Sequence, residues 1–474
     1  MSHEGKPSTH DKALTINVDA TKYGTFAEIG AGQEVARWFF QVGGAAGTVA
    51  KTMSAYDMAV SDAIYGPTTR YVSRQRLQAM LDHEWALLLD RLEPSRGEKT
   101  TFFVFADTVA AKSYARREEG HGWLGIRFQT QRRGPPSEII VHARMWDQEN
   151  VRQQEALGIL GVNLIFAAFY RFQEPEALLG SLMDHLTRDR MEVDMVKLSG
   201  PAFARVDNRL MSLQLVQQRL TNAALFTPDG EVVEPAELLY HKPVLIERGS
   251  FRPVTKVTLD MLERSLDQMQ REPEMAGREP VVLMEMTVRN LLAMGESIEP
   301  TDFLARVDAL SPLGRTVMVS NYSRFHNVTT YLRRYTQDWV AMVLGIPTLV
   351  EVFEEKHYQD LEGGLLEALG RLFRGRVKLY IYPWKSAQTK EPVTADNFQL
   401  PAHLRHLRHL LDHLRDNGFI QAIRDFTPTD LSILPHDVLA KLQASDPSWE
   451  NLVPAAVVRV IKERGLLGYR GAKS

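Results

Sequence analysis

The chain of 474 residues contains no cysteine. Disulfides, thiolate metal sites, iron–sulfur clusters and cysteine nucleophiles are therefore excluded. An excess of charge of one sign is also missing, because 56 Lys and Arg stand against 59 Asp and Glu, a formal net charge of −3. No overall basic field draws the protein to nucleic acid or to anionic lipid, so we expect neither nucleic acid nor a membrane as a partner.

Targeting segments and long apolar runs are missing as well. The polar start MSHEGKPSTH contains no apolar stretch that would form a secretory signal. The most apolar run, residues 156–170, is shorter than the roughly 18 residues that a membrane-spanning helix needs, and Asn163 interrupts it. We interpret this run as a buried core segment and expect a soluble, cytoplasmic protein.

What remains is the composition of an ordinary globular protein, with 44% apolar and 24% charged residues. Beyond about residue 99, short runs rich in β-branched and aromatic residues alternate with helical patterns. This alternation favours βαβ units and largely parallel sheets. The predicted fold class is α/β, with two Rossmann-like parallel-sheet halves flanked by helical N- and C-terminal regions. A single decorated βα barrel is the alternative.

Five regions follow from this pattern. The polar stretch 268–280 is the best boundary between the two halves, because it contains Pro and Glu and no strand or helix pattern. The predicted regions are a loose tail (1–20), a helical N-terminal region with Gly-rich segments (21–98), a first α/β half (99–267), a second α/β half (281–395) and a helical C-terminal region (396–474).

The first Gly-rich segment is EIGAGQ at 28–33. Glycines after a strand allow backbone N–H groups to approach a phosphate at a helix start. Gly30 and Gly32 match the beginning of a dinucleotide-binding G-x-G-x-x-G loop, but Val35 stands where the third small residue belongs. The preceding run is a poor strand, so the segment is typical of the motif only in part.

The second Gly-rich segment is GGAAGT at 43–48, followed by Lys51. A P-loop would place the lysine directly after the last glycine, and here three residues intervene. We weigh two interpretations. The segment is either a junction where small residues permit close packing, or a phosphate-binding nest with Thr48 and Lys51 as ligand contacts.

Polar residues at strand ends give the main site prediction, because ligands of open α/β sheets bind outside the carboxyl ends of the strands. Asp107 and Glu285 follow predicted strands and are candidates for acid–base chemistry or for holding a divalent cation. His142 is a candidate general acid. These three residues are the predicted catalytic set.

The predicted ligand contacts come from the same search. The loop ERGSFRP at 247–253 is the most Arg-dense, and its glycine allows close backbone approach to an anion. Arginine is suited to clamp phosphate or carboxylate through two N–H groups. The predicted contacts are Arg248, Gly249, Arg252, Arg209, Ser320 and Asn321, besides Thr48 and Lys51.

Several segments resemble an uncharacterised bacterial family known under two labels. They are YGTFAEIGAGQEVARWFFQVGGAAGTVAKTMSAYDMAVSDAIYG (23–66), VDNRLMSLQLVQQRLTNAALF (206–226), LIERGSFRPV (245–254) and DLEGGLLEALGRLF (360–373). One label, TonB-dependent receptor, implies a signal peptide and many alternating strands of about ten residues, and this chain has neither. The other, nicotinate- or nicotinamide-nucleotide adenylyltransferase, implies a Rossmann-like domain that binds ATP, a pyridine mononucleotide and Mg²⁺. The [TH]-x-G-H motif of that enzyme is not matched, so no catalytic residue is carried over.

Two functions from different classes follow. The first is an enzyme that binds a nucleotide or phosphorylated metabolite, with Mg²⁺ accompanying the nucleotide and nucleotidyl transfer related to pyridine nucleotides as its finer form. Its partner would be a small anionic ligand. The second is a non-catalytic scaffold, in which the Gly-rich and aromatic N-terminal segment forms a homo-oligomer interface. The metal ligands, if any, are not predicted.

Overall fold

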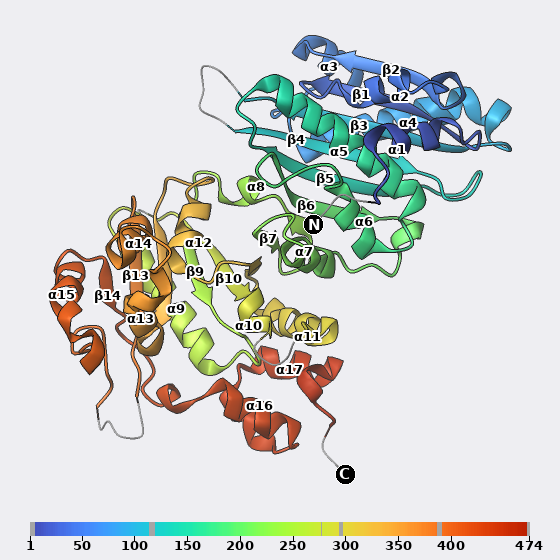
Figure 1. Cartoon of the computed structure of the whole chain (residues 1–474). Coiled ribbons are helices and arrows are strands. Elements are labelled where there is room, and N and C mark those ends of the chain that lie inside the picture. The colour runs from blue at the N-terminus through green and yellow to red at the C-terminus, as the bar shows by residue number, and fades with distance from the viewer. Residues whose placement is uncertain (1–4, 113–118, 276, 293–296, 386–390, 472–474) are drawn as a thin grey trace. The chain divides into compact units, whose positions relative to one another are not determined.

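The computed structural model describes residues 5–112, 119–275, 277–292, 297–385 and 391–471. The chain forms two compact units, Met1–Ala224 and Leu225–Ser474, which run from blue to green and from green to red in Figure 1. Each unit is built around one sheet with flanking helices, and this confirms the α/β class. The strands form two separate sheets, so the alternative prediction of a single βα barrel is wrong. The predicted boundary at 268–280 lies inside the second unit.

The first sheet has the order β2-β1-β3-β4-β5-β6. β1 is parallel to β2 and β3, whereas β3 to β6 pair antiparallel. The links from β3 to β4 and from β4 to β5 are too short to hold a crossover helix, so these strands must return antiparallel. Only β1, β2 and β3 of the first sheet are parallel, so the prediction of a parallel sheet holds for this part alone. Their bounds are β1 (Lys22–Gly30), β2 (Val49–Ala55), β3 (Thr101–Ala110), β4 (Gly120–Phe128), β5 (Ser137–Met145) and β6 (Met191–Ser199).

The N-terminal hundred residues differ from the prediction in two places. The region 21–98 was predicted to be helical, but it contains β1 and β2. Gly24, which weakens the strand pattern of β1, is required there, because a Cβ would lie 2.4 Å from the Phe103 ring on β3. The predicted loose tail contains a helix, Thr9–Asn17, which a capping box between Ser8 and Asp11 begins.

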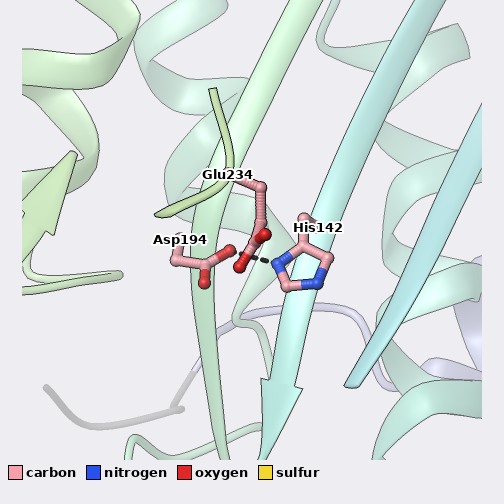
Figure 2. Close-up of side chains that lie close together, drawn as sticks. All are labelled: His142, Asp194 and Glu234. Carbon is pink, nitrogen blue, oxygen red and sulfur yellow. Dashed lines mark hydrogen bonds and ion pairs between the residues drawn. The ribbon is translucent and has the colours of Figure 1, made fainter. Parts of the chain in front are cut away.

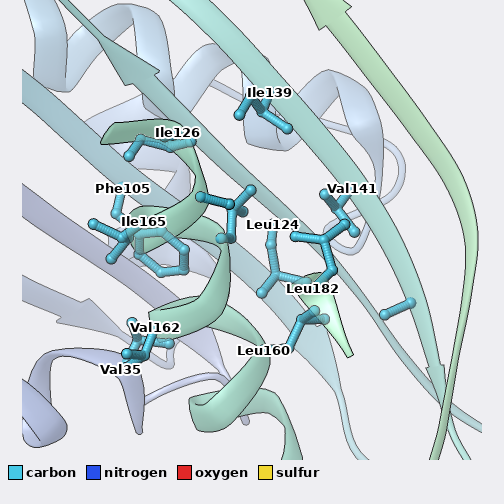
Figure 3. Close-up of a cluster of buried hydrophobic side chains, with 14 of the residues drawn as sticks. Val35, Phe105, Leu124, Ile126, Ile139, Val141, Leu160, Val162, Ile165 and Leu182 are labelled. Carbon is cyan, nitrogen blue, oxygen red and sulfur yellow. The ribbon is translucent and has the colours of Figure 1, made fainter. Parts of the chain in front are cut away.

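Helices cover both faces of the first sheet. Their bounds are α1 (Thr9–Asn17), α2 (Val35–Gln41), α3 (Met58–Tyr65), α4 (Arg74–Arg96), α5 (Asn150–Tyr170), α6 (Pro175–Leu182) and α7 (Asn208–Gln217). Figure 3 shows Leu160, Val162 and Ile165 of α5 among side chains of the sheet that include Phe105 and Leu124. Most of the apolar run at 156–170 is buried in this core, as predicted from the sequence.

The opposite face of the first sheet is covered by α4. Residues alternate between the two faces along a strand, so Gly125 faces away from its neighbour Leu124. A Cβ at Gly125 would lie 3.0 Å from Leu81 and 3.1 Å from Leu77, both on α4. Ser73 caps the start of α4 by accepting from the Arg76 N–H. No helix in the described parts of the chain combines the length and the apolar character that crossing a membrane requires.

The second sheet has the order β14-β13-β12-β9-β10-β11-β7-β8. From β14 to β11 every pair is parallel, and chain order reverses between β9 and β12. This is the order of the doubly wound Rossmann fold, whose ligands bind where the order reverses. The bounds are β7 (Ala223–Phe226), β8 (Val232–Val233), β9 (Val244–Arg248), β10 (Val281–Thr287), β11 (Thr316–Ser320), β12 (Val340–Gly345), β13 (Val377–Tyr382) and β14 (Ile420–Ala422).

Helices lie between the strands of this unit and after its last strand, β14. They are α8 (Pro235–Leu239), α9 (Lys256–Gln270), α10 (Val288–Leu292), α11 (Pro300–Leu310), α12 (Phe325–Leu332), α13 (Ile346–Phe353), α14 (Gly364–Leu372), α15 (Arg408–Asp416), α16 (Pro435–Gln443) and α17 (Ala455–Arg464). The region 396–474 is largely helical, as the sequence predicts, but β14 lies within it and completes one edge of the sheet.

Candidate functional site

Three predicted residues meet at the carboxyl ends of β9, β10 and β11. Both oxygens of Glu285 accept from Arg248, from Nε at 2.8 Å and from Nη2 at 2.9 Å. The Ser320 hydroxyl donates to the same carboxylate at 2.6 Å. Neighbouring parallel strands end at the same edge of a sheet, so residues far apart in the chain come together here, as the strand-end argument predicted.

This strand-end cluster holds its arginine firmly. Arg248 also donates to the Ser323 carbonyl at 3.2 Å, and its guanidinium lies 4.4 Å from the centre of the Phe325 ring. The Arg248 side chain is 10% exposed, whereas Glu285 is fully buried. Glu285 therefore has no oxygen to offer to a metal ion, and Arg248 presents only its remaining N–H groups at the edge.

The loop after β9 is fixed by a second set of ion pairs. Asp302 accepts from Arg252 at 2.6 Å and from Arg306 at 2.7 Å. Arg306 in turn donates to the Ser250 carbonyl at 3.2 Å. Two arginines share one aspartate, so this loop retains an excess of positive charge.

Gly249 and Asn321, two further predicted contacts at this edge, differ in their availability to a ligand. The Gly249 N–H donates to the Glu285 carbonyl at 3.0 Å, so it is not directed at a ligand. A Cβ at Gly249 would lie 2.8 Å from the Phe251 ring, which explains why glycine is needed there. Asn321 is exposed and has no side-chain partner among the residues that the structure describes. Of the predicted contacts at this edge, Asn321 is the side chain most available to a ligand.

Glu247, one residue before Arg248, opens the Arg-dense loop singled out from the sequence but was not among the predicted site residues. It is buried, and its Oε2 atom has no hydrogen-bond partner in the described part of the chain. Burial raises the pKa of Glu247 well above its ordinary value, because a charged carboxylate is poorly solvated there. Burial therefore favours the neutral form of this carboxyl, which does not repel an anion.

The remaining predicted residues belong to the first unit, and most of them are engaged inside it. Lys51 forms an ion pair with Glu84, and Arg209 forms one with Asp207. Thr48 is fully buried, and its hydroxyl faces the Asn17 carbonyl at 3.3 Å. These contacts favour the packing interpretation of the second Gly-rich segment, and the role of these residues as ligand contacts stays a prediction.

Asp107 forms a buried acid pair with Glu28. The two residues are opposite each other on the parallel strands β3 and β1. Glu28 accepts from the Val35 N–H at 2.8 Å and from the Ala36 N–H at 3.3 Å, just after the first Gly-rich segment. Burial raises the pKa of Glu28 to about 7. Glu28 also lines a hollow of about 400 Å³ together with Ser54.

Asp107 itself is fully buried. Neither carboxylate oxygen has a partner of good hydrogen-bond geometry among the described residues. Burial and then the charge of Glu28 raise the pKa of Asp107, and a weak contact with the Ile29 N–H opposes the rise. Burial therefore favours the protonated form of Asp107, which does not fit a metal ligand. Its catalytic role stays a prediction.

The raised pKa of Asp107 predicts how the stability of the protein changes with pH. The raised pKa means that the folded protein binds a proton which the unfolded chain releases above about pH 4, so Asp107 lowers stability as pH rises. Asn is uncharged in both states and has the same shape. We expect Asp107→Asn to gain stability over wild type by about 1.4 kcal/mol for each pH unit above pH 4, until Asp107 ionises in the folded state. Urea unfolding at several pH values measures this gain, and the exposed Asp90→Asn should show none.

His142 stands in a buried polar network on the face of the first sheet opposite Asp107. Its Nδ1 atom lies 2.5 Å from Asp194 on β6, and Figure 2 shows the two side chains joined by this contact. Arg144 donates to the other Asp194 oxygen at 2.9 Å. The His142 Nε2 atom lies 3.1 Å from His121 Nδ1, so the two rings share one proton. The Trp123 ring packs against His142.

His121 is the neutral end of this network. Burial, followed by the charges of His142 and Arg144, lowers the pKa of His121 to about 3. A neutral histidine accepts a hydrogen bond through one nitrogen only, so the tautomers of the two rings decide which of them donates in this contact. The network can hold and relay a proton, but His142 and Asp194 are buried, so the general-acid role of His142 stays a prediction.

The fold of the second unit defines a Rossmann-like α/β protein. No protein-family model matches the chain, and no curated protein does. Several solved structures are similar to about a third of it. The competence/damage inducible protein CihA from Agrobacterium tumefaciens has 18% identity and a TM-score of 0.25, and the match covers 34% of this chain and 94% of that chain. The competence damage-inducible protein ComA from Klebsiella pneumoniae has 15% identity and a TM-score of 0.25, with the same coverage. TM-scores this low do not establish a shared fold or activity, so the proposals below rest on the chain's own geometry.

Proposed function

We propose that the second unit binds a nucleotide or another phosphorylated metabolite at the carboxyl ends of β9, β10 and β11. The observation that carries this proposal is the reversal of strand order between β9 and β12, where doubly wound sheets bind their ligands. The adjoining edge holds Arg248 in place and leaves Asn321 exposed. The loop after β9 has an excess of positive charge, and burial of Glu247 favours the form of its carboxyl that does not offset this charge.

Nucleotidyl transfer related to pyridine nucleotides is the finer form of this proposal. Catalysis of that kind would depend on positioning and on charge stabilisation by the arginines, without a covalent intermediate. Mg²⁺ is expected only as a companion of the nucleotide phosphates. Neither Glu285, which is fully engaged by Arg248 and Ser320, nor the buried Asp107 fits as its ligand.

A thermal-shift and titration experiment tests the binding function. ATP, AMP, NAD and sugar phosphates, each with and without Mg²⁺, are added to the whole protein. A ligand present at 100 times its dissociation constant should add about 2.7 kcal/mol of stability. Asn321→Ala removes an exposed amide and should weaken binding about tenfold without changing the melting temperature of the free protein. The exposed Asn451→Ala is the matched control and should bind as wild type does. Equal binding by both variants would contradict the proposed site.

A second candidate function, the homo-oligomeric scaffold, is favoured by one feature of the first unit. β2 lies at an edge of the sheet, and its only partner among the described strands is β1. Large apolar side chains are exposed just beyond it, including Tyr56 at 81% and Met58 at 61%. An open edge beside apolar residues is suited to pairing with another copy of the chain. The oligomeric state in solution distinguishes this function from a binding function of a monomer.

A further inference from the structure

One cavity of the first unit is rich in positive charge. It has a volume of about 720 Å³ and lies among α1, α6, the end of α5 and the turn after α7. Its lining contains one carboxylate, Asp184, and five cationic side chains, which are Lys6, Lys12, Arg171, Arg188 and Arg219. None of these residues was singled out by the sequence analysis, because they lie in five separate places along the chain.

The floor of this basic cavity is a rigid polar network. The Lys12 side chain is 1% exposed, and its ammonium donates to Asp184 at 2.7 Å and to Asn163 at 2.8 Å. Asn163 is the polar residue that interrupts the apolar run of α5, and its amide donates to the carbonyls of Leu182 at 2.9 Å and Asp184 at 2.8 Å. Asp184 also accepts from Lys6 at 2.5 Å. The single carboxylate is therefore already shared by two lysines.

The arginines at the rim have few partners. Arg188 donates to the Gln218 carbonyl at 3.3 Å, and burial together with the nearby charge of Arg219 lowers the pKa of Arg188. Arg171 and Arg219 have no side-chain hydrogen bond or ion pair within the described ranges of the chain. Arg188 and Arg219 repel each other, Arg171 repels Lys12, and a bound anion would relieve this repulsion.

The other side chains of the cavity are largely apolar, among them Phe166, Met183 and Leu186. A bare anion would leave these surfaces unused. This cavity is partly open to solvent, and its volume is that of a site for a small organic ligand. The shape, charge and lining together define one class of ligand.

We infer that this cavity binds a small organic phosphate with an aromatic or apolar part. The phosphate is held by Arg171, Arg188 and Arg219. The apolar part packs against Phe166 and its neighbours. This site is separate from the strand-end site of the second unit and does not rest on the function proposed for it.

Isothermal titration of the whole protein with AMP, phenyl phosphate, inorganic phosphate and adenosine tests this inference. AMP or phenyl phosphate should bind at least tenfold more tightly than inorganic phosphate or adenosine, and binding should weaken as salt is raised from 50 to 300 mM, a change of about twofold in screening length. The variant R171A/R219A should weaken this binding by about 30- to 100-fold. Both arginines are exposed, so the variant should fold normally.

Two controls separate this site from other effects. R37A/R152A removes two exposed arginines of the same unit that do not line the cavity, and it should bind as wild type does. The exposed Asn451→Ala, in the second unit, should also bind these compounds as wild type does. The inference is overturned if R171A/R219A binds AMP and phenyl phosphate as wild type does, if neither compound binds, or if inorganic phosphate binds as tightly as they do.

Discussion

Replacing Asp194 by Asn is expected to lower the free energy of unfolding of the first unit by about 3–5 kcal/mol. Asp194 is the shared acceptor of two buried groups, since His142 and Arg144 both reach its carboxylate. An amide can accept through one atom only, so the change leaves a buried guanidinium or imidazole without its negative partner. Uncompensated buried charge is among the most costly defects in a folded protein.

Hydrogen exchange of peptides from β5 and β6 measures this effect, because it reports on the first unit separately from the second. Exchange of these peptides should become faster by two orders of magnitude or more, on the order of the factor that 3 kcal/mol implies. Asp90→Asn, an exposed position on α4, is the control and should leave exchange unchanged. Equal protection in both variants would show that the network does not contribute to stability.

Arg248→Met is expected to destabilise the second unit by about 3 kcal/mol, because it leaves the fully buried Glu285 as an unpaired charge. Glu285→Gln in the same chain should restore most of this loss. A glutamine at 285 is neutral, and its carbonyl still accepts from Ser320. Urea unfolding of the two single variants and the double variant gives the coupling energy, which we expect to be about 2 kcal/mol.

This double-mutant cycle also separates the contribution of Arg248 to stability from its contribution to ligand binding. If the double variant is as stable as wild type but no longer binds a nucleotide, the arginine contacts the ligand. Additive losses in the cycle would instead contradict the direct contact between Arg248 and Glu285. Arg248→Lys is a useful companion variant, because an ammonium cannot reproduce the two parallel N–H contacts with the carboxylate.

The position of residues at strand ends predicted, from sequence alone, that Arg248, Glu285 and Ser320 lie together, and their role in binding a ligand stays a prediction. Arg248, Glu285 and Ser320 follow apolar runs of the kind that form buried parallel strands, and such strands end at one edge. The sequence did not indicate that Glu285 and Arg248 would neutralise each other. That depends on the register of β9 against β10, in which Arg248 is paired with Glu285, and register is set by the packing of the whole sheet.

The strands at the start of the first unit were not predicted from the sequence. β1 contains Gly24 and the charged Glu28, and both weaken the local strand signal. Tertiary contacts override that signal, because Gly24 lets Phe103 approach and Glu28 finds the N–H groups of Val35 and Ala36. The basic cavity could not be predicted from the sequence either, because only the folded chain brings Lys12 and Arg219 together.

The most direct test of the proposed function is hydrogen exchange of the whole protein with and without saturating ATP. We expect slower exchange in peptides that cover residues 249–255 and 320–324, where the loops after β9 and β11 lie. Residues 377–382 of β13 should be unaffected. ATP binding that leaves both loops unchanged would contradict a nucleotide site at this edge of the second sheet.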